Sequence, residues 1–248
     1  MDLYRLIEEL KKERNYLESP LELYKKVKRF EEACERALEE KGELPPGLVF
    51  QEFVKAFELK PEETEGLQEL VGVLADDPTV EEEVLLEVLG KDALLGDVQL
   101  QEVKRVLFLL RKPFLLARRK RQRQVKQLDP AKCPVCDQYI SLTLIDLDNR
   151  RHMVCTLCGH REEVTRIGCS YCLHKNPEKI KILVDEDEIR VELCELCKTY
   201  IKSFKDEVYR KYKDPNLIDI LSLPLDVVAQ QRGFIRRSPN AIGVREIG

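Results

Sequence analysis

The stretch CTLCGHREEVTRIGCSYC, residues 155–172, contains four cysteines in two C-x-x-C pairs. With the pairs on either side of it, the region holds four: Cys133/Cys136, Cys155/Cys158, Cys169/Cys172 and Cys194/Cys197. Two intervening residues let the backbone turn tightly and point both sulfurs at one ion, as in tetrahedral structural metal sites. The quoted stretch is therefore either one complete site or two halves of different sites.

An internal repeat decides between these possibilities. LIDLDNRRHMVCTLC, residues 144–158, aligns with LVDEDEIRVELCELC, residues 183–197, at a constant offset of 39 with seven identical positions. A C-x-x-C pair precedes each block, with 18 residues between the pairs of the first copy and 21 in the second. The sequence therefore predicts a duplicated unit, and the quoted stretch holds the last half of one site and the first half of the next.

Each copy supplies four thiolates, which is the complete ligand set of one tetrahedral structural metal ion. We predict a first site of Cys133, Cys136, Cys155 and Cys158, and a second site of Cys169, Cys172, Cys194 and Cys197. Four sulfur ligands suit Zn²⁺ or a single iron, so the expected cofactors are two metal ions per chain, iron or zinc. Units this short bury little apolar area, whereas structural metal binding contributes about 10–16 kcal/mol, so folding is expected to require the metal.

Two other interpretations of the cysteines stay open at this point. Cross-brace pairing would join the first pair to the third and the second to the fourth. Redox chemistry is less favoured, because a thioredoxin-type C-x-x-C needs a βαβ context and a helix that begins at the motif. The ninth cysteine, Cys34, has no partner two residues away and lies in an apolar helical stripe, so we expect a buried thiol.

The residues before the cysteine region predict helices. The apolar stripe recurs at three- and four-residue steps through Leu23, Val27, Phe30, Cys34 and Leu38. Ser19-Pro20-Leu21-Glu22 predicts a capping box at the start of this helix. Another helix is expected over 79–89 with a stop at Gly90, and Pro113 is expected to kink or end a helix that begins near Val98.

The predicted fold is α+β. LTLIDLD and KILVDED alternate as strands do, and a hairpin in each unit would bring its two pairs together. REEVTRIG, residues 161–168, is expected to link the units, and the i, i+4 spacing of Tyr200, Phe204, Val208 and Tyr212 predicts a helix after Cys197. The expected domains are a helical domain over 1–128, rubredoxin-like or zinc-ribbon units over 129–166 and 167–203, and C-terminal helices and tail over 204–248.

The composition favours a soluble cytoplasmic protein. The 248 residues include no apolar run long enough to span a membrane, and the N-terminus carries no signal-peptide pattern. In a reducing cytosol, nine cysteines indicate metal binding rather than disulfides. No Ser/His/Asp constellation, phosphate loop or acidic dyad is present, so no enzyme is predicted. His160 and His174 follow cysteine pairs and are expected to form hydrogen bonds rather than to serve as extra ligands.

Charge is distributed unevenly along the chain. Residues 51–100 carry fourteen acids against three bases, whereas residues 103–128 carry ten Lys or Arg and no acid. The basic run over 118–126 favours either nucleic-acid binding or, more strongly, a solvated helix face or a partner for the acidic region within the chain. The net charge of −4 makes a nucleic-acid partner unlikely.

The cysteine region resembles the formate dehydrogenase accessory protein family, FdhE. The residues that carry the resemblance are CPVC (133–136), MVCTLC (153–158), GCSYC (168–172), VELCELCKTYIK (191–202) and the tail LPLDVVAQQRGFIRRSPN (223–240). The sequence departs from the family pattern after CPVC, where Asp137-Gln138-Tyr139 stand in place of small residues. The resemblance covers roughly residues 130–240, and the N-terminal helices match only in type.

The resemblance implies a cytoplasmic assembly chaperone with two rubredoxin-like iron or zinc sites, which binds the catalytic subunit of respiratory formate dehydrogenase before export. The alternative is a zinc-ribbon nucleic-acid-binding protein that uses the basic run, including Arg118, Arg119 and Arg121, and the surfaces of the cysteine turns. A third, an enzyme that handles sulfur or electrons, is disfavoured because four thiolates leave no open position for substrate. The acidic 51–100 region adds a hypothesis of its own: it would attract a basic client segment, such as a twin-arginine leader.

Overall fold

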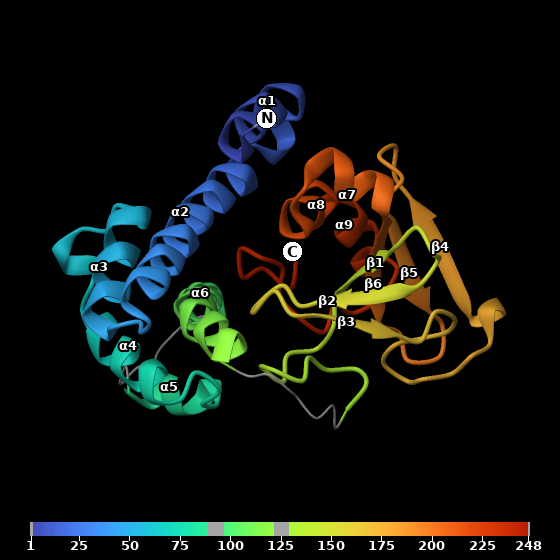
Figure 1. The fold of residues 1–248 in the computed structure, drawn as a ribbon. Helices are drawn as coiled ribbons and strands as arrows, with labels where there is room; N and C mark the ends of the chain where they lie inside the picture. The colour runs from blue at the N-terminus through green and yellow to red at the C-terminus, as the bar shows by residue number, and fades with distance from the viewer. Residues whose placement is uncertain (1, 89–96, 122–128, 248) are drawn as a thin grey trace. The chain divides into compact units, whose positions relative to one another are not determined.

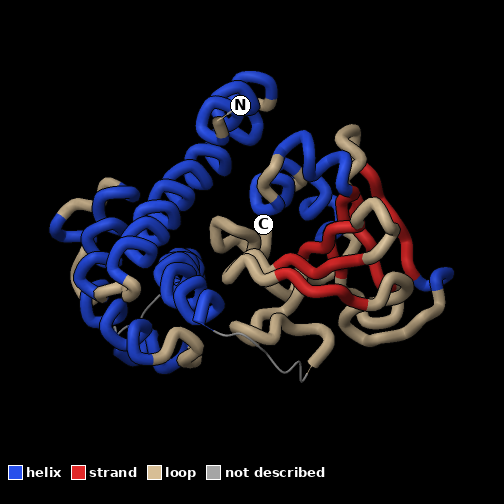
Figure 2. Tube along the Cα trace, in the orientation of Figure 1, coloured by secondary structure: helices blue, strands red, loops and turns tan. Residues whose placement is uncertain are grey.

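The computed structural model describes residues 2–88, 97–121 and 129–247 (Figure 1). The chain divides into two compact units, Met1–Arg123 and Gln124–Gly248. The first unit is helical, and the described residues of the second form a sheet, two four-cysteine clusters and three α-helices (Figure 2). The predicted α+β fold class is confirmed. No helix among the described residues is long and apolar enough to cross a membrane.

The described part of the first unit contains two long helices and several shorter ones. Its helices are α1 (Leu3–Glu13), α2 (Glu18–Lys41), α3 (Pro46–Phe57), α4 (Leu67–Asp76), α5 (Glu82–Val88) and α6 (Asp97–Arg121), with short 3₁₀ turns at Asn15–Leu17 and Pro61–Glu63. α2 contacts α1, α3 and α6. Its stripe is buried at Val27, Phe30, Cys34 and Leu38, as the periodicity predicts, and half-buried at Leu23.

The predicted start of α2 is wrong, and of the two outcomes expected at Pro113, a kink or an end, the helix does not end there. α2 begins at Glu18, directly after the 3₁₀ turn, so Ser19 lies in the first turn and does not cap the helix. α6 continues through Pro113 to Arg121. A proline inside a helix costs about 3 kcal/mol, and the core around it, including Leu110 and Phe114, outweighs that cost. The predicted stop at Gly90 lies outside the described residues.

Basic side chains of α6 form ion pairs with acidic side chains of the first unit. The Lys112 ammonium lies 2.5 Å from the Glu31 carboxylate of α2, and the Lys112 side chain is 3% exposed. Burial raises the pKa of Glu31, but the charges of Lys112 and Lys28 more than offset this, so the pKa lies below its usual range. Lys104 similarly lies 3.7 Å from Glu82. The α6 cations therefore neutralise carboxylates of the first unit.

The second unit contains one six-stranded sheet. Its strands are β1 (Leu142–Ile145), β2 (Arg151–Val154), β3 (Arg161–Val164), β4 (Ile180–Val184), β5 (Arg190–Cys194) and β6 (Tyr200–Lys205). The spatial order is β3-β2-β1-β6-β5-β4. Neighbouring strands are antiparallel except β1 and β6, which are parallel with Leu142 opposite Lys202. The first strand of copy one thus pairs with the last strand of copy two, and the two copies share one sheet.

This topology corrects two sequence predictions. The start of the expected linker, Arg161–Val164, is strand β3. Of the helix expected after Cys197, Tyr200 and Phe204 lie in strand β6, whereas Val208 and Tyr212 lie in a helix as expected. β3 and β6 are equivalent in the repeat, because the offset of 39 carries Arg161 onto Tyr200. An i, i+4 spacing fits a strand as well as a helix, because alternate residues of a strand share one face. The helix that follows is α7 (Asp206–Tyr212), which begins only after β6 has ended.

The C-terminal helices pack on the sheet. α7 (Asp206–Tyr212) contacts β1 and β6, α9 (Leu223–Gln231) contacts β5, and α8 (Pro215–Leu221) lies between them in the chain (Figure 1). Apolar strand residues buried in this unit include Leu142, Leu144, Val191, Leu193 and Phe204. The helices and strands together form the core of the second unit.

A buried cluster of four charges fastens the C-terminal tail to this core. Lys202 of β6 lies 2.8 Å from Asp219 of α8 and also pairs with Asp226 of α9. Arg236 of the tail pairs with the same two carboxylates, at 2.6 Å and 3.1 Å. All four side chains are at most 2% exposed. Burial raises the pKa of Asp219, but the charges of Arg236 and Lys202 more than offset it and lower the pKa to about 2.

Candidate metal centres

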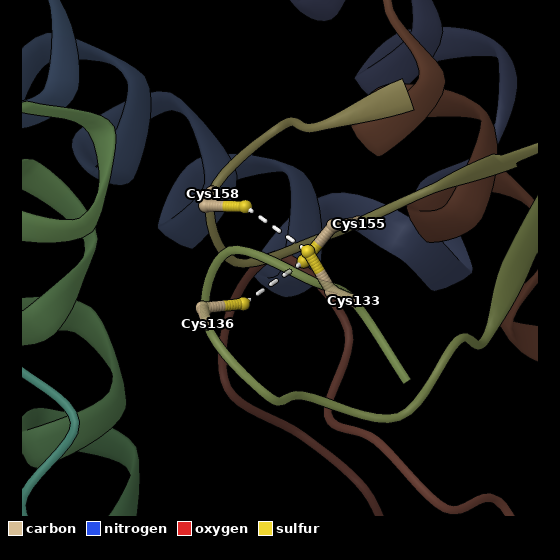
Figure 3. Close-up of side chains that lie close together, drawn as sticks. All are labelled: Cys133, Cys136, Cys155 and Cys158. Atoms are coloured by element: carbon tan, nitrogen blue, oxygen red, sulfur yellow. Dashed lines mark hydrogen bonds between the residues drawn. The ribbon is translucent and has the colours of Figure 1, made fainter. Parts of the chain in front are cut away.

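The first cluster draws its thiols from the two ends of a hairpin. Cys133 and Cys136 precede β1, whereas Cys155 and Cys158 follow β2. The sulfur of Cys133 lies 3.5 Å from that of Cys158, and the sulfur of Cys136 lies 3.4 Å from that of Cys155. Figure 3 shows the four thiols converging on one point. All four residues are buried.

The second cluster repeats this plan with more solvent exposure. The sulfur of Cys169 lies 3.6 Å from that of Cys197, and the sulfur of Cys172 lies 3.7 Å from that of Cys194. Cys172 is exposed and Cys197 is half-buried, whereas Cys169 and Cys194 are buried. The grouping of the pairs follows the repeat and not the cross-brace alternative.

The sulfur spacing of both clusters suits a tetrahedral ion. In each cluster the four sulfur atoms lie within 4.8 Å of one another. Metal–sulfur bonds of about 2.3 Å in tetrahedral geometry place sulfurs about 3.8 Å apart, close to the separations found here. All nine cysteines of the chain lie among the described residues, and each is a free thiol. Each cluster could therefore hold one metal ion.

The four C-x-x-C turns share one backbone conformation. In each turn the residue after the second cysteine donates its N–H to the carbonyl of the first cysteine. That residue has a positive φ in every turn: Asp137 (57°), Gly159 (70°), Leu173 (59°) and Lys198 (56°). The N–H of the first cysteine is bonded to the carbonyl five residues later. Asp137, where the sequence departs from the family pattern, thus adopts the same left-handed conformation as Gly159, which Asp tolerates.

Gly168 lets the backbone pass close to the carbonyl of His174 directly before the first cysteine of the second cluster. Its φ is +98°, and an added Cβ would lie 1.9 Å from the carbonyl oxygen of His174. That carbonyl accepts the N–H of Cys169 at 3.0 Å, so a clash there would displace a bond of the cysteine turn. Only glycine fits this position.

We expect Gly168→Ala to lower the free energy of unfolding of the metal-loaded protein by about 3 kcal/mol and to weaken metal retention at the second cluster. Gly233→Ala is the matched control, because Gly233 has a similar φ of +80° with nothing within 4 Å of its added Cβ. Its cost should be the strain of the left-handed conformation alone, about 1 kcal/mol. Urea unfolding and metal analysis check the pair, and equal effects would contradict the steric account.

Neither histidine near the cysteine pairs completes a ligand set. His174 Nε2 lies 3.2 Å from the sulfur of Cys194, within reach of a hydrogen bond to a thiolate. His160 Nε2 lies 3.4 Å from the Glu162 carboxylate. Both histidines are thus placed to form hydrogen bonds. The four thiols of each cluster already form a complete ligand set without them.

One buried arginine joins the two copies. Arg151 of β2 is 1% exposed, and its guanidinium lies 3.0 Å from the Glu192 carboxylate of β5. Its Nε donates to the Thr143 hydroxyl at 3.3 Å, and its Nη1 donates to the carbonyl of Gly168 at 3.4 Å. Arg151 is one of the seven residues that are identical in the two copies of the repeat. Its partner Glu192 lies on a strand of the other copy, and the sequence does not predict that the two side chains meet. The ion pair joins β2 of the first copy to β5 of the second copy.

The second unit is similar to known proteins. Residues 153–242 match the family model "FdhE, C-terminal domain". "Protein FdhE homolog" of Haemophilus ducreyi is 32% identical over 112 residues, which cover 44% of this chain and 36% of that protein. "Protein FdhE homolog" of Aquifex aeolicus is 30% identical over 121 residues, covering 45% and 41%. The chain thus matches little more than a third of the length of these relatives, and the expected resemblance is confirmed.

The fold is similar to a solved structure, "The crystal structure of the FdhE protein from Pseudomonas aeruginosa". The TM-score is 0.54 at 20% sequence identity, and the match covers 89% of this chain and 95% of that one. At this identity the likeness concerns the fold alone. Because the match covers 89% of the chain, it extends into the helical first unit, beyond the residues 153–242 that the family model matches.

Proposed function

We propose that the chain is an accessory protein in the maturation of respiratory formate dehydrogenase, because its second unit is similar to the C-terminal domain of FdhE proteins. The observation that carries the proposal is the pair of four-cysteine clusters on one shared sheet, six of whose eight cysteines lie within the matched residues 153–242. The chain would bind the catalytic subunit of the dehydrogenase in the cytoplasm before export. It would act as a chaperone and not as an enzyme.

The proposed metal ligands are the eight clustered cysteines, with one iron or zinc ion at each cluster. A complete set of four thiolates leaves no coordination position for a substrate, which favours a structural role over catalysis. The protein would supply the ordered cysteine turns and the buried surroundings that hold the ions in place. Iron at these sites would also permit one-electron transfer.

The described part of the basic run supports a role inside the first unit. Lys120 lies 3.1 Å from the Glu39 carboxylate, and Arg121 Nη2 donates to the carbonyl of Gly42 at 3.4 Å. Arg118 lines a hollow together with Asp76 and Asp77. These partners leave less positive charge for a nucleic acid. Residues 122–126 of the run lie outside the described residues.

We expect anaerobic affinity purification of the tagged chain from its own cells to recover a formate dehydrogenase catalytic subunit, identified by mass spectrometry. Recovery should be lost with Cys155→Ser or Cys169→Ser, because either change removes a ligand from a cluster. Cys34→Ser is the matched control and should retain the subunit, because Cys34 lies in α2 outside both clusters. RNA or ribosomal proteins in place of an oxidoreductase would instead support the nucleic-acid-binding alternative.

A further inference from the structure

The first unit contains an apolar groove that its own described side chains do not fill. The groove has a volume of about 290 Å³ and is formed by residues from α2, α3, α4 and α6. Its walls include Phe53, Phe57, Leu70, Val103 and Val106. A cavity of about 150 Å³ accepts a benzene ring, so this groove has room for about two large apolar side chains.

The rim of the groove is acidic. Glu63, Glu65 and Glu102 line it, and Arg105 is the one cation among the lining residues that the structure describes. Arg105 is already paired with Glu102 at 3.1 Å. Glu63 is held in place because its carboxylate accepts the N–H of Lys60 at 2.8 Å, and both Glu63 and Glu65 are exposed. Among the described residues no ion pair joins Glu63 or Glu65 to a cation, so the rim presents two carboxylates beside an apolar floor.

We infer that this groove binds a partner segment in which Arg or Lys residues stand next to two large apolar side chains. The inference rests on the proposed function, since the client of an accessory protein would supply the segment. The apolar side chains would displace water from the walls at Phe53, Phe57 and Val106, while the cations would meet Glu63 and Glu65. An acidic segment would be repelled by the same rim.

A defined probe tests the inference with the full metal-loaded chain. The probe is a fluorescein-labelled peptide of twelve residues with two arginines followed by alternating leucine and serine. Its binding is measured by fluorescence anisotropy at low and at physiological salt. We expect binding that weakens as salt rises, and at least tenfold weaker binding when glutamate replaces the arginines or serine replaces the leucines. Equal binding of the three peptides, or no binding of the probe, would overturn the inference.

Variants of the rim locate the binding site. Glu63→Gln combined with Glu65→Gln should weaken probe binding about tenfold at low salt, because both carboxylate charges are lost. Glutamine at 63 can still accept the N–H of Lys60. The matched control combines Glu40→Gln with Glu43→Gln, which changes the net charge equally at exposed positions outside the groove, and it should bind as the wild type does. Equal effects of the two double variants would contradict this location.

A second change separates the apolar contribution from the charge. Val106→Phe adds bulk to the groove wall and should abolish probe binding without altering the rim. Circular dichroism and the unfolding midpoint show whether this variant remains folded. The rim variants keep the inference testable if it does not, because they alter exposed side chains only.

Affinity purification with the wild type and the rim variants distinguishes failure of the groove inference from failure of the proposed function. If the wild type recovers the formate dehydrogenase catalytic subunit but does not bind the probe, the groove inference fails and the proposed function stands. If the wild type binds the probe but recovers no such subunit, the proposed function fails while the groove still binds basic apolar peptides. Recovery that falls with Glu63→Gln and Glu65→Gln supports both.

Discussion

Exchange of Cys155 for serine is expected to remove a metal ion from the purified chain and to unfold the Gln124–Gly248 unit. The sulfur of Cys155 lies 3.4 Å from that of Cys136 inside a fully buried cluster, and serine is a poor substitute for a thiolate ligand. Structural metal binding contributes about 10–16 kcal/mol, as much as the whole stability of a typical domain, about 5–15 kcal/mol. A unit that loses this contribution should not stay folded.

The shared sheet makes the expected unfolding cooperative. β1 of the first copy pairs with β6 of the second along four residues, and Arg151 bridges to Glu192 across the junction. Loss of one cluster should therefore unfold strands of its own copy, and the other copy then loses the strand with which it pairs. Cys155→Ser and Cys169→Ser should both expose the whole unit to proteolysis rather than one half of it.

Cys34→Ser is the control for this prediction. Cys34 is 1% exposed within α2, and burial raises the pKa of its thiol to about 12, which indicates a neutral core residue. Its exchange should cost about 1–3 kcal/mol through burial of a hydroxyl and should leave the metal content unchanged. Metal analysis with limited proteolysis checks all three variants. An intact second unit in Cys155→Ser protein with one metal ion or none would contradict the prediction.

Exchange of Asp219 for asparagine is expected to lower the free energy of unfolding by about 3–5 kcal/mol. The change leaves the charges of Lys202 and Arg236 buried with Asp226 as the remaining carboxylate. Asp219 is 0% exposed, so water cannot replace the lost partner. The effect is large because breaking a buried pair leaves an uncompensated charge, whereas forming the pair contributes little.

An exposed ion pair provides the comparison. Asp148→Asn removes a partner of Arg150, whose guanidinium lies 2.8 Å from Asp148 with side chains 52% and 73% exposed. Such surface pairs contribute about 0–1 kcal/mol, so this variant should unfold at nearly the wild-type urea concentration. Similar urea midpoints for the Asp219 and Asp148 variants would show that the buried cluster does not hold the tail as described.

The grouping of the cysteines into two clusters was predictable because the internal repeat shows which C-x-x-C pairs belong to one unit, whereas the C-x-x-C spacing alone does not. The constant offset of 39 assigns each pair to its neighbour, and the structure groups the sulfurs accordingly. The pairing of β1 with β6 was not predictable, because Arg161–Val164 and its repeat equivalent share no identical residue. The spacing of Tyr200 and Phe204 fits both a helix and a strand, and only the observed pairing of β6 with β1 and β5 distinguishes the two.

The buried charge cluster shows a second limit of sequence reasoning. Lys202, Asp219, Asp226 and Arg236 come from β6, α8, α9 and the tail, and nothing in their local sequence distinguishes them from solvated charges. The tail resemblance over 223–240 includes Asp226 and Arg236 but does not indicate that they meet. The tertiary fold alone brings the four together.

The most direct test of the account is native mass spectrometry of the complex that the tagged chain forms in its own cells under anaerobic conditions. The predicted species contains one formate dehydrogenase catalytic subunit and a chain that carries two metal ions. A complex with this subunit but a metal-free chain would contradict the role of the clusters. A chain with two metal ions and no dehydrogenase subunit would contradict the proposed function.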